Sequence, residues 1–81
     1  MLTEHQIQAL LDDLCRRFGI CLPLSFQRRL KNSPPTNAVR FAEVVFRAEG
    51  LEPALGGELY KSVVARVEQA FAQPQDDNYS V

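Results

Sequence analysis

The chain has 81 residues, of which 46% are hydrophobic and 23% are charged, and its formal net charge is −1. These values are typical of one small globular domain with a modest core, and they exclude a chain that is disordered throughout. The near-neutral total also disfavours a globally basic nucleic-acid-binding protein, although a local basic patch is allowed.

The first predicted element is an amphipathic helix over residues 3–18. Its apolar residues recur every three or four positions and therefore share one face: Ile7, Leu10, Leu11, Leu14 and Phe18. Thr3 and Gln6 have the spacing of a capping box at its start. Gly19 can end the helix because glycine adopts a positive φ readily.

A short helix is expected over residues 25–31, after a connection that contains Pro23. Ser25 can cap it, and Phe26 and Leu30, which are four residues apart, would face inward. The Asn-Ser-Pro-Pro sequence that follows ends this helix, because proline is excluded from helix interiors and disfavours helix at the preceding residue.

The next predicted helix covers residues 37–49, with Thr36 or Asn37 as its cap and Gly50 as its stop. Leu51 can supply the hydrophobic contact of a Schellman ending. The helix is apolar around most of its circumference, and one narrow stripe carries charge: Arg40, Glu43 and Arg47. A strand is an alternative for its β-branched centre, but the alternation of a half-buried strand is missing.

The last predicted helix covers residues 58–72, after a turn region in which Pro53 can open a single helical turn. Gly56 and Gly57 argue against one continuous helix through this region. The apolar face of the last helix is broad and comprises Leu59, Tyr60, Val63, Val64, Val67, Ala70 and Phe71. Arg66 falls on the opposite, polar side.

Together these elements predict an all-α single domain over residues 1–73, followed by a flexible polar tail over residues 74–81. The architecture is a compact bundle of three main helices, at about 3–18, 37–49 and 58–72, plus a short helix near 25–31. The expected core contains Ile7, Leu10, Leu11, Leu14, Phe18, Leu22, Phe26, Leu30, Phe41, Val44, Val45, Leu59, Val63, Val67 and Phe71.

Membrane and export signals are missing from the sequence. No apolar run approaches the roughly 18 residues of a membrane span, and the N-terminus lacks the pattern of a signal peptide. We therefore expect a cytoplasmic protein without membrane contact. Cys15 and Cys21, the only cysteines, are too few for a disulfide framework, and we expect them to be reduced and packed as small buried hydrophobes.

Catalytic and metal-binding groups are also sparse. The one histidine, His5, lies in the first turn of an amphipathic helix, where we expect it to be exposed and without a nucleophile to activate. Asp12 and Asp13 point in different directions on a helix, and the other carboxylate pair, Asp76 and Asp77, lies in the tail. Two cysteines and a distant histidine do not supply the four ligands of structural zinc. The sequence thus predicts no enzyme, no cofactor and no metal.

Basic side chains gather on the outer face of the short helix, at Arg28, Arg29 and Lys31, without an acidic partner at helical spacing within it. This cluster is either a solvated helix face or a contact for phosphate or for an acidic partner protein. Reading of DNA by a helix-turn-helix is disfavoured, because helix 37–49 would present valine, phenylalanine and alanine to the base edges.

The apolar character of helix 37–49 has two interpretations: it is the central core helix, or part of it contacts another chain. For the second, Val45 and Phe46 are the candidate contacts. The sequence therefore predicts a non-enzymatic protein-interaction module (adaptor, regulator or inhibitor) that binds a partner protein or forms a homodimer through this helix. Nucleic-acid binding through the basic cluster at 28–31 is the alternative.

Overall fold

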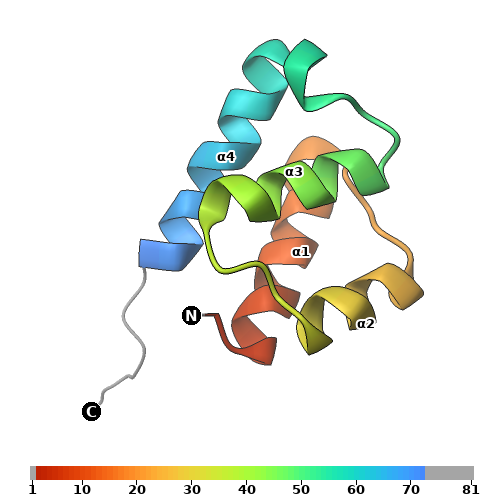
Figure 1. Ribbon diagram of the computed structural model, residues 1–81, viewed down its shortest axis with the longest axis vertical. Coiled ribbons are helices and arrows are strands. Elements are labelled where there is room, and N and C mark those ends of the chain that lie inside the picture. The colour runs from red at the N-terminus through yellow and green to blue at the C-terminus, as the bar shows by residue number, and fades with distance from the viewer. Residues whose placement is uncertain (1, 73–81) are drawn as a thin grey trace.

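The computed structural model describes residues 2–72, and most of that range is helical (Figure 1). The elements are α1 (Glu4–Phe18), α2 (Leu24–Asn32), α3 (Ala38–Ala48), the short 3-10 helix η1 (Pro53–Leu55) and α4 (Gly57–Ala72). No strand occurs within residues 2–72, and the all-α prediction is confirmed. The predicted tail at 74–81, including Asp76 and Asp77, lies outside the described residues.

The predicted caps of α1 and α3 are confirmed. In the capping box, the Thr3 Oγ1 accepts from the Gln6 N–H at 3.1 Å, and the Gln6 Oε1 accepts from the Thr3 N–H at 2.8 Å. Gly19 ends α1 with a φ of 71°, and its N–H donates to the Cys15 carbonyl at 3.0 Å. At the start of α3, Asn37 is the residue whose side chain caps the helix.

The end of α3 is a complete Schellman motif. Gly50 takes a φ of 80°, and its N–H donates to the Arg47 carbonyl at 2.9 Å. The Leu51 N–H donates to the Phe46 carbonyl at 3.0 Å. These two bonds satisfy carbonyls that would otherwise lack partners at a helix end.

The start of α2 differs from the prediction. Pro23, rather than Ser25, occupies the cap position, and its carbonyl accepts from the Phe26 and Gln27 N–H groups, each at 3.0 Å. The fixed φ of proline suits a helix start, and its missing N–H removes a donor that would have no partner there. Ser25 lies inside the first turn and is exposed.

The core lies where α3 meets α4 and where α1 meets α4 and α2, with α3 crossing in front of α1 in Figure 1. Its buried apolar residues are Leu2, Ile7, Leu10, Leu11, Leu14, Ile20, Leu22, Leu30, Phe41, Ala42, Val45, Phe46, Val63, Val67 and Ala70. Of the predicted core, Phe18, Phe26, Val44 and Phe71 are partly buried against it. The assignment of Leu59 was wrong, because this side chain is 38% exposed.

Candidate functional site

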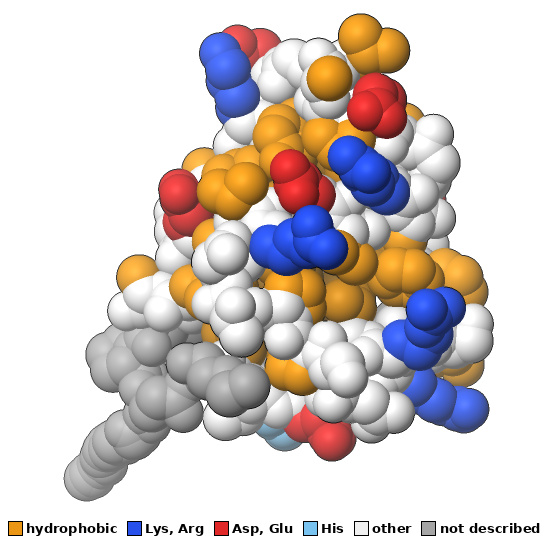
Figure 2. Space-filling view, viewed as in Figure 1, with side chains coloured by type: hydrophobic (Ala, Val, Ile, Leu, Met, Phe, Trp, Pro, Cys, Tyr) orange, Lys and Arg blue, Asp and Glu red, His pale blue; other side chains and the backbone are white. Residues whose placement is uncertain are grey.

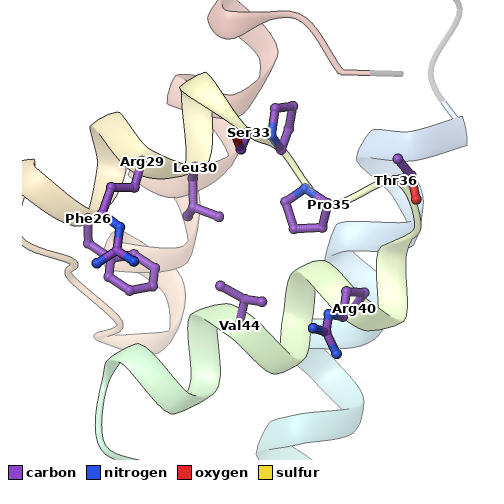
Figure 3. A pocket seen from close by; sticks show the side chains of 9 residues that line it. Phe26, Arg29, Leu30, Ser33, Pro35, Thr36, Arg40 and Val44 are labelled. Carbon is purple, nitrogen blue, oxygen red and sulfur yellow. The ribbon is translucent and has the colours of Figure 1, made fainter.

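A groove of about 480 Å³ lies between α2 and α3 (Figure 3). Its lining residues are Phe26, Arg29, Leu30, Ser33, Pro34, Pro35, Thr36, Arg40 and Val44. Leu30 from α2 and Val44 from α3 point toward each other across its floor. The groove is therefore largely apolar inside, with polar and charged groups along its rim.

The sequence between the helices explains why the groove stays open. Pro34 and Pro35 end α2 and cannot extend a helix, so residues 33–36 cross from one helix to the other as irregular backbone. Among the helix pairs, α2 packs mainly against α1, whereas α3 packs mainly against α4. Each helix thus has its own support, and the space between them is left as a surface depression.

Two arginines stand on opposite sides of the groove, Arg29 on α2 and Arg40 on α3. The Arg29 guanidinium lies over the Phe26 ring, 5.8 Å from its centroid. Arg40 is 4.0 Å from a Glu43 carboxylate oxygen in an exposed ion pair. No acidic residue lines the groove itself. In Figure 2 an orange floor separates the charged side chains over α3 from the blue side chains over α2.

The predicted basic cluster is only partly a free surface. Arg28 and Arg29 are exposed, but Lys31 is half-buried and its ammonium donates to the Gln8 Oε1 of α1. Lys31 therefore belongs to the contact between α1 and α2 and is not a third free cation. Arg28 lines a small depression together with Glu4, Lys31 and Asn32.

Val45 and Phe46, the candidate partner contacts, lie in the core. Their exposed fractions are 0% and 1%, because α3 turns them toward α4. The Phe46 ring packs edge-on against Tyr60, with 5.2 Å between the ring centroids. Helix α3 thus buries both side chains in the core, and neither is on the surface that a partner could touch. The most exposed large apolar residue of α3 is Val39, at 48%.

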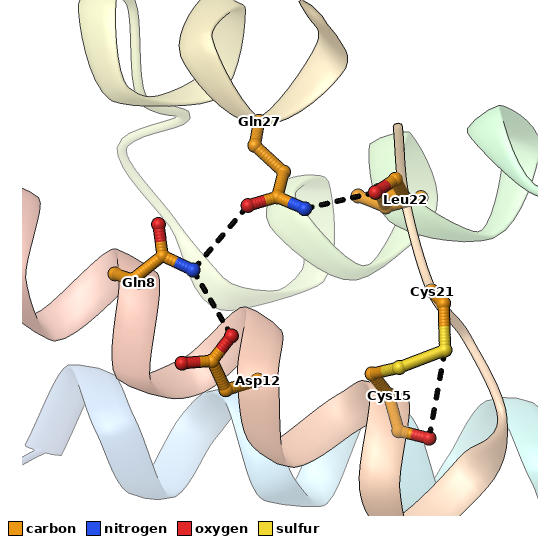
Figure 4. The surroundings of a disulfide bond; sticks show 6 residues. All are labelled: Gln8, Asp12, Cys15, Cys21, Leu22 and Gln27. Carbon is orange, nitrogen blue, oxygen red and sulfur yellow. Dashed lines mark hydrogen bonds between the residues drawn. A yellow bond between two sulfur atoms is a disulfide. The ribbon is translucent and has the colours of Figure 1, made fainter. Parts of the chain in front are cut away.

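The cysteines also differ from the expectation of reduced, buried thiols, which was wrong. Cys15 and Cys21 form a disulfide (Figure 4). The reason is local: Gly19 reverses the chain after α1, so that Cys21 returns beside the last turn and the two Cα atoms are 4.4 Å apart. Cys21 is exposed and Cys15 is half-buried.

A hydrogen-bond network holds α2 on α1 (Figure 4). The Gln8 Nε2 donates to the Asp12 Oδ1 at 3.0 Å and lies 3.3 Å from the Gln27 Oε1. The Gln27 Nε2 in turn donates to the Leu22 carbonyl at 2.8 Å. Sequence reasoning missed this network; its one signal is that Gln8 follows the buried Ile7 and that Gln27 lies three residues before the buried Leu30 on the same side of its helix.

Groups for catalysis or metal binding do not converge in the part of the chain that is described. His5 is exposed, and no three histidine, cysteine, aspartate or glutamate side chains within residues 2–72 lie close enough to hold a metal ion. Ser33 and Thr36 are the hydroxyl groups of the groove, and no carboxylate or imidazole lines it.

No described helix is long and apolar enough to cross a membrane. Comparison with protein-family models, curated proteins and solved structures found no match for this chain.

Proposed function

We propose that this protein is a non-enzymatic interaction module, an adaptor, regulator or inhibitor, that binds a segment of another polypeptide chain in the α2–α3 groove. The observation that carries the proposal is the groove itself, with an apolar floor that includes Phe26, Leu30 and Val44. Concave, mostly apolar sites with a few polar groups at the rim are the usual form of a binding site. The module requires no cofactor or metal for this role.

Nucleic-acid binding through the basic cluster is the weaker candidate. Binding to a phosphate backbone relies on several lysines and arginines acting together. Of the three predicted cations, Lys31 is hydrogen-bonded to Gln8, and Arg28 shares its depression with Glu4. Two exposed arginines, Arg28 and Arg29, are left at this face of α2, which is few for a site that binds a phosphate backbone.

The cytoplasmic location stays a prediction. Disulfides persist mainly in oxidising compartments, so the bond between Cys15 and Cys21 argues against it. Alkylation of free thiols in intact host cells, followed by mass spectrometry, measures the state of both cysteines. Thiols that are fully alkylated before any reduction step would support the cytoplasm.

The test of the proposed function is site-specific photo-crosslinking in a lysate of the native host. One variant carries the photoreactive residue at Ser33, which is exposed and lines the groove, and the control carries it at Ser62, which is exposed on α4 outside the groove. We expect the Ser33 probe to capture one protein in a nuclease-resistant way and the Ser62 probe to miss it.

The groove-filling variant Ser33→Trp checks that the captured protein occupies the groove. Because Ser33 is exposed, circular dichroism should show an unchanged fold, while recovery of the captured protein falls by about tenfold or more. Equal capture by both probes would contradict the proposal. Capture that disappears with nuclease would support nucleic-acid binding instead.

A further inference from the structure

We infer that the groove takes the η1 end of a second copy of this chain. The inference rests on the proposed function and adds the identity of the segment that binds. The η1 end comprises residues 49–59, which include the 3-10 helix after α3 and the first residues of α4. Its chemistry complements the groove in both apolarity and charge.

The apolar complement of the groove is Leu55. This side chain is 85% exposed, which is the highest fraction among the exposed large hydrophobic residues of the described chain. Leu51 and Leu59, on either side of it in the sequence, are 36% and 38% exposed. An isolated exposed leucine needs no explanation, but three exposed leucines along one short segment give that segment the apolar character of an interface.

The charge of the η1 end is opposite to that of the groove. Glu49, Glu52 and Glu58 flank its leucines, and all three are exposed. The groove presents Arg29 and Arg40, and no acidic residue lines it. Arginine pairs with carboxylates through two parallel hydrogen bonds, a geometry that lysine cannot provide. A leucine on the apolar floor would therefore place glutamates within reach of an arginine on each wall.

The ion pairs that these charged groups make within one chain do not prevent them from pairing with a second copy. Arg40 and Glu43 are joined by a pair 4.0 Å long, with 69% of the Arg40 side chain exposed. Glu58 pairs with Lys61 at 3.7 Å, and both side chains are more than three-quarters exposed. Exposed pairs of this kind contribute little to stability and are easily replaced.

The position of the two surfaces makes the contact intermolecular. In Figure 1 η1 lies at the end of the molecule opposite α2, so one copy does not fill its own groove. A groove and a complementary segment on different parts of the surface give a head-to-tail contact, which adds copies one after another. Because the contact is small, we expect weak association that depends on protein concentration.

A nucleic acid fits the groove less well than this segment. The lining has one aromatic side chain, Phe26, and the Arg29 guanidinium lies over its ring, 5.8 Å from the centroid, where a stacked base would have to displace it.

The experiment combines two variants of the full chain in sedimentation velocity. Leu55→Ser removes the apolar anchor but keeps the groove, whereas Ser33→Trp fills the groove but keeps the η1 end. Both positions are exposed, so circular dichroism should show folded protein for each. We expect the unmodified chain to associate as its concentration rises, and each variant alone to associate about tenfold more weakly or not at all.

The mixture of the two variants is the most direct test of the inference. The Leu55→Ser chain keeps an intact groove, and the Ser33→Trp chain keeps an intact η1 end that can bind in it. A mixture of equal amounts should form a dimer and nothing larger. Leu24→Ser is the matched control, because Leu24 is 70% exposed but belongs to neither surface, and this variant should associate like the unmodified chain.

Two results would overturn the inference: an unmodified chain that stays monomeric, or variants that associate alone as strongly as the unmodified chain. If the chain is monomeric while the Ser33 probe still captures a different protein, the proposed function stands and only the identity of the bound segment is wrong. If the Ser33 probe captures nothing and the chain is monomeric, both are wrong.

Discussion

The two helices that border the groove are held in place by different means. On α3, Phe41, Val45 and Phe46 are fully buried, and Phe41 packs edge-on against Phe71 of α4 with 6.1 Å between the ring centroids. On α2, Leu30 is the one buried residue, and it is 4% exposed. The helix is held instead by hydrogen bonds to α1 and by the disulfide in its preceding connection.

This difference implies that the groove has one fixed wall, which is α3, and one adjustable wall, which is α2. Burial of large apolar side chains is the main stabilising contribution in a small domain, and α3 has most of it. Segments with few buried apolar contacts open locally at low free-energy cost, and α2 has these features. The shape of the groove should therefore depend mainly on whatever keeps α2 on α1.

The largest effect is expected from removing the centre of the fixed wall. Phe41→Ala deletes a ring that is 0% exposed, and the loss should lower the free energy of unfolding by about 3–5 kcal/mol. Because domains of this size have little stability to spare, the variant should be largely unfolded in circular dichroism.

Phe26→Ala is the matched control on the adjustable wall. Phe26 is half-buried and packs at the edge of the core, so its removal should cost about 1 kcal/mol and leave the helices folded. Urea unfolding of the two variants gives the comparison directly. Equal losses of stability would contradict the idea that the two walls are supported differently.

An intermediate effect is expected from breaking the disulfide. Replacing both Cys15 and Cys21 by serine removes a constraint on a short loop, and the chain-entropy model gives a loss of about 2 kcal/mol. Because Cys21 precedes α2, the backbone amides of α2 should exchange with solvent faster in this variant. The backbone amides of α4 should exchange faster only to the extent that the whole domain is less stable.

Hydrogen exchange followed by mass spectrometry distinguishes this local effect from a general one. A variant in which the amides of α2 and α4 speed up by the same factor would show that the disulfide stabilises the whole domain and not the adjustable wall. Reduction of the unmodified chain is the control, since it breaks the same bond without changing the composition of the core.

The fold could be predicted largely because its signals are local. The capping box at Thr3, the positive φ of Gly50 and the helical turn at Pro53 each depend on residues within one turn of the chain. In the turn region, Gly56 separates η1 from α4 as the sequence predicts. The sequence does not show a second reason for glycine here, which is that a Cβ at this position would lie 2.6 Å from the Tyr60 Cβ.

The candidate site was harder to predict because it depends on contacts between segments far apart in the sequence. Lys31 was assigned to an outer basic face, but its partner, Gln8, is 23 residues away. Phe46 was a candidate surface contact, and only the position of Tyr60 on another helix places it inside. The spacing of residues along one helix shows which of them share a face, but not which neighbouring helix that face meets.

The smallest effect is expected from a polar contact between the two helices that support the walls, from Asp13 of α1 to Arg66 of α4. The Arg66 Nε lies 2.6 Å from the Asp13 Oδ2, and the Arg17 Nε lies 3.2 Å from the other carboxylate oxygen. The hydrogen bond from Arg66 is the main reason why the pKa of Asp13 is lowered from 3.8. Asp13→Asn should cost about 1 kcal/mol at neutral pH.

The pH dependence of that loss identifies its origin. A carboxyl group with a lowered pKa in the folded state stabilises the fold above its unfolded pKa, and the contribution disappears as the pH falls through the folded value. The difference between the unmodified chain and Asp13→Asn should therefore be present in full above the ordinary pKa of 3.8 and should shrink toward zero as the pH falls through the lowered pKa of the folded state. Asp12→Asn is the control, because the Asp12 carboxylate accepts from Gln8 and makes no ion pair within residues 2–72. A difference that persists in acid would mean that the shape of the Asp13 side chain, and not its charge, links α1 to α4.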